Sequence, residues 1–148
     1  MTALYHYSSE AEVVRLGEGF HACTLPKAEW THGAHWAAAF WLILMRPDIL
    51  PERDMPDLIR RYNLSTGTEN TDTGGYHETI TQASLIVARA FIAREGAGTA
   101  LHDLCNALFA SPFGKSDWLF AYWRKETVFS VKARREWVAP DLKPLELT

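Results

Sequence analysis

Hydrophobic residues are concentrated in one continuous run, residues 36–45, where ten positions in succession are apolar. A helix without a polar side is buried on all sides in a folded protein. We therefore predict a central helix over residues 31–45, in which Thr31 is the N-cap and Pro47 ends the helix. A start near Thr24 is also open, because Pro26 would then lie in the first turn, where its missing N–H costs little.

The rest of the chain combines helical periodicity with turn residues. The pattern predicts helices over residues 8–16, 52–62, 75–94 and 99–110, and one long or two short helices over residues 116–138. Gly17 and Gly19 are expected to end the first of these helices. Since no segment shows the alternation of a strand, the expected fold class is all-α. We predict a compact single-domain helical bundle of about five to seven helices over residues 1–148, with a tail from about residue 140.

The connection over residues 63–75 is rich in Ser, Thr, Asn, Asp and Gly, and it is longer than most connections in compact domains. Long loops of this kind often carry function. Asp72 or Thr73 is expected to cap the helix that follows, although Asn70, Thr71, Asp72 and Thr73 would also suit a lid over a pocket.

Composition narrows the class of protein. The chain has 148 residues, 47% of them hydrophobic and 22% charged, which is typical of one globular domain. Its net charge of −3 gives no general attraction to nucleic acid or to an anionic membrane. Basic and aromatic residues do mix over residues 115–135, but a solvated helix face is the favoured interpretation of that segment. We expect no nucleic-acid or membrane partner, whereas a small-molecule ligand and a homo-oligomer both stay open.

The N-terminal residues lack the basic and apolar regions of a signal peptide, and a ten-residue apolar run is too short for a membrane span, which takes about 20 residues. Two cysteines, Cys23 and Cys105, are too few for a disulfide framework. The expected location is therefore the cytoplasm.

Histidines at the start of the predicted central helix are the first candidates for chemistry. His32 and His35 are three residues apart, and Glu29 precedes His32 by three. Residues at this spacing are neighbours on a helix surface. Glu-x-x-His is also the spacing with which helical bundles present a carboxylate and an imidazole to a shared metal. The three side chains would line one edge if the helix starts early.

A second group opens the predicted helix over residues 75–94. His77 falls on the inward face of this helix, and Glu78 lies beside it. Both groups of histidines thus lie at helix N-termini, where the helix dipole favours the neutral imidazole that binds metal or accepts a proton. If the two N-termini converge, a divalent Zn, Fe, Mn or Ni ion is the expected cofactor. Its candidate ligands are His32, His35, His77, Glu78 and Glu29.

Aromatic and hydroxyl residues accompany these groups in the sequence. An apolar wall beside a few polar groups is the usual construction of a ligand site. The candidate pocket residues are Trp30, Thr31, Trp36, Asp72, Tyr76 and Thr79. A purely structural interpretation stays open as well, because histidines in a first turn often bond loop carbonyls, and aromatic residues at this spacing often belong to the core.

Two sequence blocks, W-T-H-x-x-H at residues 30–35 and G-Y-H-E-T at residues 75–79, carry a resemblance to known sequences. The chain resembles an uncharacterised family of small bacterial helical proteins that share both blocks, over about residues 20–95. The resemblance implies a bacterial origin and a cytoplasmic location. It implies no activity and no catalytic residue.

Two functions are compatible with this pattern, and whether the chain is an enzyme stays open. The first is a small metal-binding enzyme, in which a metal-bound water would be the reactive species. The alternative is a non-catalytic helical module that binds a small anionic ligand or a protein partner through a polar pocket of histidines and threonines. P-loop, Rossmann, G-x-S-x-G and H-E-x-x-H motifs are all missing from the sequence, so none of those chemistries has support.

Overall fold

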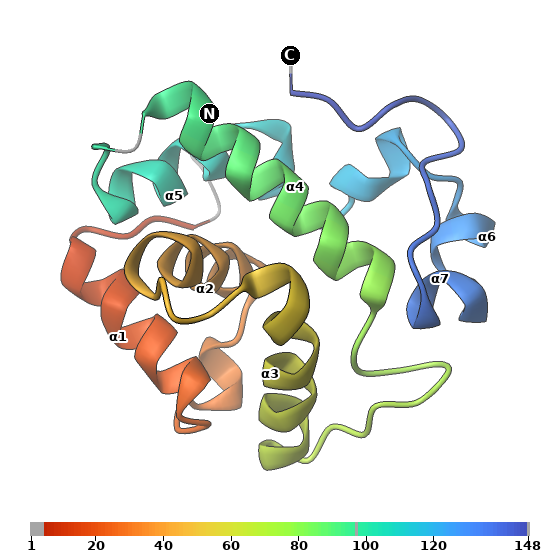
Figure 1. Cartoon of the computed structure of the whole chain (residues 1–148), viewed down its shortest axis with the longest axis horizontal. Coiled ribbons are helices and arrows are strands. Elements are labelled where there is room, and N and C mark those ends of the chain that lie inside the picture. The colour runs from red at the N-terminus through yellow and green to blue at the C-terminus, as the bar shows by residue number, and fades with distance from the viewer. Residues whose placement is uncertain (1–4, 97, 148) are drawn as a thin grey trace.

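Helix α2 (His32–Met45) lies at the centre of the computed structural model, which describes residues 5–96 and 98–147 (Figure 1). Four other helices contact it: α1 (Glu10–His21), α3 (Pro51–Ser65), α4 (Glu78–Glu95) and α5 (Leu101–Phe109). Nine of the 14 residues of α2 are buried. Its N-cap is Thr31, whose Oγ1 accepts a hydrogen bond from Ala34 N at 3.1 Å. The buried central helix and its cap are therefore confirmed.

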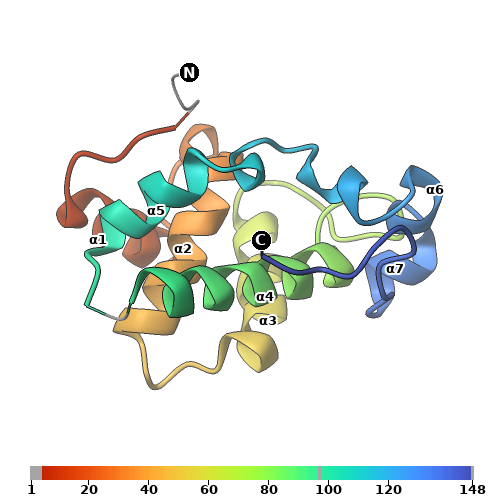
Figure 2. The same ribbon diagram turned by 90° about the horizontal axis from the view of Figure 1, so that it is seen from above.

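The described residues form seven α-helices and no strand, which confirms the all-α class. The last two helices, α6 (Lys125–Val128) and α7 (Val131–Arg135), lie at one end of the molecule, beside the start of α4 (Figure 2). Short 3₁₀ turns occupy Lys27–Glu29, Pro112–Gly114 and Trp118–Ala121. No helix in the described ranges is both long enough and apolar enough to cross a membrane.

The chain after residue 116 forms a 3₁₀ turn and two short α-helices, α6 and α7, which agrees with the alternative of two short helices predicted there. Side-chain oxygens accept hydrogen bonds from backbone N–H groups where α6 and α7 begin. Asp141 accepts from Arg124 N at 2.9 Å, and Ser130 Oγ accepts from Ala133 N at 3.1 Å. Such side-chain bonds compete with continuation of a helix.

Helix α1 continues through Gly17 and Gly19 to His21, so the prediction that these glycines end it is wrong. A Cβ on residue 17 would lie 2.3 Å from the indole of Trp41, which is itself only 3% exposed. The glycine therefore allows α1 and α2 to approach more closely than a side chain would permit. Packing between the two helices, rather than helix termination, explains its place in the sequence.

Pro56 lies inside α3 and does not end it. Because proline has no N–H, the carbonyl of Glu52 loses its usual partner in the helix. Gln82 of α4 donates its Nε2–H to this carbonyl over 3.1 Å. The Glu52 carboxylate also binds Arg89 of α4 through contacts of 2.6 and 2.7 Å. The residue of α3 that lacks its helical hydrogen bond, Glu52, is thus the point at which α4 packs against α3.

The loop that joins α3 to α4 is held at its base by Asn70. The Asn70 Oδ1 accepts from Tyr76 N and from Asn63 Nδ2, both at 3.0 Å, and its Nδ2 donates to Arg60 O at 3.2 Å. Gly75 then has a φ of +77°, and a Cβ there would lie 2.4 Å from a backbone oxygen of the loop. The tight turn into α4 therefore requires glycine at this position.

The close contact between α1 and α2 gives a stability test. Gly17→Ala is expected to lower the free energy of unfolding by about 1–3 kcal/mol, because the new methyl group overlaps the Trp41 indole. The sign is informative, since alanine in place of glycine in an unobstructed helix raises stability by about 1 kcal/mol. Urea denaturation measures the change. Gly98→Ala is the control, because a Cβ there would meet nothing within 4 Å. A stabilised Gly17→Ala protein would contradict the packing described.

Candidate functional site

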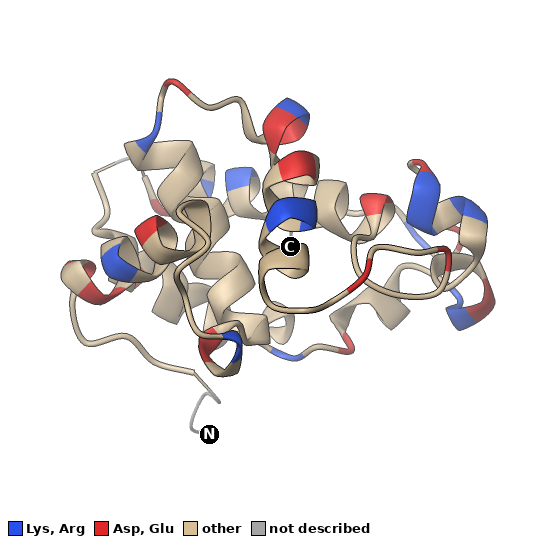
Figure 3. Ribbon diagram, turned by 90° about the horizontal axis from the view of Figure 1, so that it is seen from below, with Lys and Arg blue, Asp and Glu red and all other residues tan. Residues whose placement is uncertain are grey.

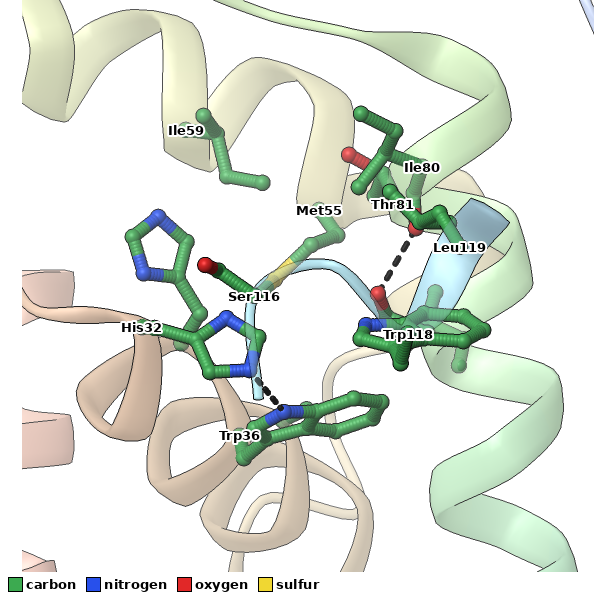
Figure 4. A pocket seen from close by; sticks show the side chains of 13 residues that line it. His32, Trp36, Met55, Ile59, Ile80, Thr81, Ser116, Trp118 and Leu119 are labelled. Atoms are coloured by element: carbon green, nitrogen blue, oxygen red, sulfur yellow. Dashed lines mark hydrogen bonds between the residues drawn. The ribbon is translucent and has the colours of Figure 1, made fainter. Parts of the chain in front are cut away.

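A cavity of about 370 Å³ lies between α2, α3, α4 and the segment 116–119 (Figure 4). Most of its wall is apolar, and its polar members are few. Its apolar wall includes Trp36, Met55, Ile59, Leu85, Trp118 and Leu119, and its polar side chains are His32, His35, Thr81, Ser84 and Ser116. A largely apolar concave site with a few polar groups is the usual form of a small-molecule pocket.

His32 is fixed in the cavity wall by the chain that follows α5. Its Nε2 lies 3.0 Å from the carbonyl oxygen of Phe113 and 3.3 Å from Nε1 of Trp36. One nitrogen cannot donate to the carbonyl and accept from the indole at once, so the two contacts exclude each other. We assign the proton to Nε2, facing Phe113, because that contact is the shorter one; the indole N–H of the buried Trp36 is then without an acceptor in the described ranges. The other ring nitrogen, Nδ1, is then unprotonated.

His35 is fixed by its own helix start. Its Nδ1 lies 2.6 Å from the carbonyl oxygen of Thr31, so Nδ1 carries the proton and Nε2 is left as an acceptor. The ring packs on Trp30 with centroids 4.0 Å apart. Desolvation by the surrounding protein lowers the pKa of His35, an effect that the Thr31 carbonyl opposes and that the neighbouring His32 reinforces. The side chain is nevertheless exposed, so solvent in the cavity moderates this effect.

The two imidazoles therefore present a common chemistry to the cavity. Each has one nitrogen bound to a backbone carbonyl, and each has one nitrogen without a protein partner in the described ranges. The unprotonated nitrogens, His32 Nδ1 and His35 Nε2, can only accept a hydrogen bond or bind a cation. In Figure 4 the His32 ring lies beside Trp36 at the edge of the cavity that also carries Ser116.

His77 does not belong to this cavity. It is the N-cap of α4: its Nδ1 accepts from Ile80 N at 3.2 Å, and its Nε2 donates to the carbonyl of Val128 at 2.6 Å. The expected cap by Asp72 or Thr73 is therefore wrong. His77 is 7% exposed, and burial lowers its pKa. Because both ring nitrogens have partners, His77 has no lone pair left for a metal.

The two candidate carboxylates are also engaged elsewhere. Glu29 lies in the 3₁₀ turn before α2, so the early helix start that would have aligned it with His32 does not occur. Its Oε1 instead accepts from Arg15 Nη2 at 2.8 Å. Glu78 accepts a short hydrogen bond of 2.5 Å from the hydroxyl of Tyr76, whose pKa is raised by burial and by this carboxylate.

The five candidate metal ligands therefore do not form one centre. Among the residues that the structure describes, no three His, Cys, Asp or Glu side chains come together in a way that could hold a metal ion. Only His32 and His35 share a cavity. His32 and His77 instead bond the carbonyls of Phe113 and Val128, which belong to two different segments of the chain.

The candidate pocket residues are divided among several places. Trp36 lines the cavity, whereas Thr31 caps α2 and is not among the lining residues. Trp30 is partly buried and packs against the core, stacked on Phe20 with centroids 4.6 Å apart. The Thr79 hydroxyl joins α4 to the chain after α7, through Glu136 O at 2.9 Å and Val138 N at 3.0 Å. Asp72 and Tyr76 line a second, polar cavity.

Several cavity residues were absent from the sequence-based set. Met55 and Ile59 are four residues apart on α3 and form part of its buried stripe, a pattern that the sequence shows. Ser116 and Trp118 lie outside the α-helices, and only the folded chain brings them to the cavity beside α2. Pattern analysis could have found the first pair but not the second.

The role assigned to His77 can be tested by stability measurements. His77→Ala should lower the free energy of unfolding by about 1–3 kcal/mol, because the Ile80 N–H and the Val128 carbonyl lose their partner. His77→Asn is the matched variant: its side-chain oxygen keeps the cap on Ile80 and removes only the bond to Val128. Equal losses in both variants would contradict the capping role.

The lowered pKa of His77 also predicts a pH dependence. The unfolded chain, with a pKa near 6.5, binds the proton before the folded chain does as the pH falls. The stabilisation by neutral His77 is therefore fully present above about pH 6.5 and is lost on acidification below it. In urea denaturation, the stability difference between wild type and His77→Asn should shrink between pH 7.5 and pH 5. A difference that grows over this range would contradict the assignment.

Comparisons with known proteins add no relative: no protein-family model, no curated protein and no solved structure matches the chain. The resemblance to small bacterial helical proteins stays an expectation.

Proposed function

We propose that the chain binds a small, mostly apolar molecule carrying a hydrogen-bond donor, in the cavity between α2, α3, α4 and residues 116–119. The observation that supports this proposal is the pair of imidazole nitrogens, His32 Nδ1 and His35 Nε2, left without partners in the described ranges by the bonds to Phe113 and Thr31. Both nitrogens accept and neither donates. A hydroxyl, an amide N–H or an ammonium group is their complement.

The size and the apolar wall of the cavity favour a ligand whose main part is compact and apolar. Its volume of about 370 Å³ falls at the lower end of ligand pockets, which span about 300–1,000 Å³. Trp36, Trp118 and Met55 provide flat and adaptable apolar surface for a ring. In such surroundings a hydrogen bond to an imidazole is stronger than in water, so it would orient the ligand.

An anionic ligand, which the sequence left as an alternative, is not favoured in this cavity. The neutral imidazoles turn lone pairs toward the ligand, and no Lys or Arg lies among the lining residues. A carboxylate or phosphate would meet lone pairs without a compensating donor from His32 or His35.

A metal ion is the second candidate. His32 and His35 each have one nitrogen held by a carbonyl, which is how metal-binding histidines are usually oriented. Two protein ligands are fewer than the three of a catalytic zinc site, so a bound molecule would have to supply the others. Enzymatic activity would depend on that molecule.

Paired small molecules test the main proposal. Phenol carries a donor and anisole, of similar shape, does not. We expect phenol to quench the fluorescence of the cavity tryptophans saturably and more tightly than anisole. His35→Phe should weaken phenol binding by about tenfold, the worth of one hydrogen bond of about 1.4 kcal/mol, and leave anisole unaffected. His6→Phe is the control, because His6 is exposed and does not line the cavity.

A cavity-filling variant locates the binding. Ile59→Trp should abolish phenol binding if the folded state, checked by circular dichroism, is retained. Equal affinity for phenol and anisole, or full binding by Ile59→Trp, would overturn the proposal.

Thermal melting in the presence of Zn, Mn, Fe or Ni tests the second candidate. A metal bound by His32 and His35 raises the melting temperature of wild type, because it binds only the folded state. His35→Phe should remove that rise. His77→Ala should retain it, since neither nitrogen of His77 is free. No rise in wild type would eliminate the metal.

A further inference from the structure

A second cavity, of about 200 Å³, lies away from the histidines, between the C-terminal half of α3, the loop before α4 and helix α7. Basic residues gather on the short helices at this end of the molecule (Figure 3). Three of the lining side chains are arginines, Arg60, Arg134 and Arg135, and one is a carboxylate, Asp72. The chain as a whole is acidic, so this excess of positive charge is local.

Each arginine is held in place by a different contact. Arg134 Nη1 donates to the carbonyls of Gly75 and Tyr76, at 3.1 and 3.2 Å. Arg60 lies over the ring of Tyr76, with Cζ 4.4 Å from the centroid. Arg135 forms a two-pronged pair with Asp72, at 2.8 and 2.7 Å. The guanidinium groups are therefore positioned before any ligand arrives.

Donors remain after these contacts are made. In the described ranges, Nε and Nη2 of Arg134 have no hydrogen-bond partner, and neither do Nε and Nη2 of Arg60. The charged contact of Arg60, with Asp57 at 3.4 Å, is made by Nη1. Asp57 does not line the cavity. The cavity thus holds more cationic donors than its single carboxylate can accept.

Asp72 occupies the position that an anionic ligand would take. Its carboxylate bonds the fork of Arg135 side-on, as a phosphate group does. The pair is exposed, with 67% and 51% of the two side chains accessible, so it contributes little stability and is easily exchanged. The loop tip that carries Asp72 is itself exposed at residues 71–73.

We propose that this cavity binds a phosphate group, which displaces Asp72 from Arg135 and is also held by Arg134 and Arg60. Phosphate suits the cavity because it carries nearly two negative charges at neutral pH and offers several acceptor oxygens to planar guanidinium groups. The phosphate could be free or could end a small ester. The site is independent of the apolar cavity, with which it shares no lining residue among those described.

The test is a calorimetric titration of the full chain with inorganic phosphate and, separately, with phenyl phosphate, both at constant ionic strength. Saturable binding is expected, and Arg134→Gln should weaken it at least tenfold. Arg60→Gln is a second variant for use if Arg134→Gln fails to fold, because the side chain of Arg60 makes no hydrogen bond to the loop. A preference for phenyl phosphate would identify an ester as the ligand class, and equal affinity would identify free phosphate.

Asp72 supplies the distinguishing variant. Asp72→Asn should increase the affinity for phosphate several-fold, because the internal competitor for Arg135 is removed. Asp48→Asn is the control: Asp48 forms the same two-pronged pair with Arg46, at 2.9 and 2.8 Å, outside any cavity described here. It should leave phosphate affinity unchanged.

Three results would overturn the proposal: absence of saturable binding, binding that Arg134→Gln and Arg60→Gln leave unchanged, or equal effects of Asp72→Asn and Asp48→Asn. None of them bears on the apolar cavity, because phenol binding there is measured separately and depends on His35 rather than on arginine.

Discussion

Enclosure of α2 is the constraint on which the rest of the structure depends. With nine of its 14 residues buried, this helix has no face that can be left to solvent, so α1, α3, α4 and α5 must all pack around it. The consequences are seen in the neighbours. Because Gly17 has no side chain, α1 can lie against Trp41. Because Pro56 has no N–H, the carbonyl of Glu52 on α3 is free to accept a hydrogen bond from Gln82 of α4.

The apolar cavity follows from the same constraint. The cavity lies beside the first turns of α2, where the helix carries His32 and His35 in place of the alanines and aromatic residues further along. Imidazoles need partners for their N–H groups, and the nearest acceptors are the carbonyls of Phe113 and Thr31. Those bonds turn the opposite nitrogens toward the space between α3 and α4, which gives an apolar cavity two acceptors.

Competition for hydrogen bonds decides which polar residues remain available. His77, Glu29 and Glu78 are as suitable for metal binding in their chemistry as His32, but each is occupied by a partner from a distant part of the chain or from its own turn. The arginines of the second cavity differ from these residues. A guanidinium group has five N–H donors, so Arg134 and Arg60 can be anchored and still have donors for a ligand.

The sequence by itself determined the helical class, the buried central helix, its Thr31 cap and the placement of two histidines at its start, because local periodicity and capping depend on neighbours within a few residues. Only the tertiary structure decided the role of Gly17, the occupation of His77 by Val128 and the meeting of Asp72 with Arg135. These depend on which side-chain ring, carbonyl or charge arrives from positions 24, 51 or 63 residues away. Such contacts are set by how closely helices pack around α2, a property of the whole molecule that no short segment encodes.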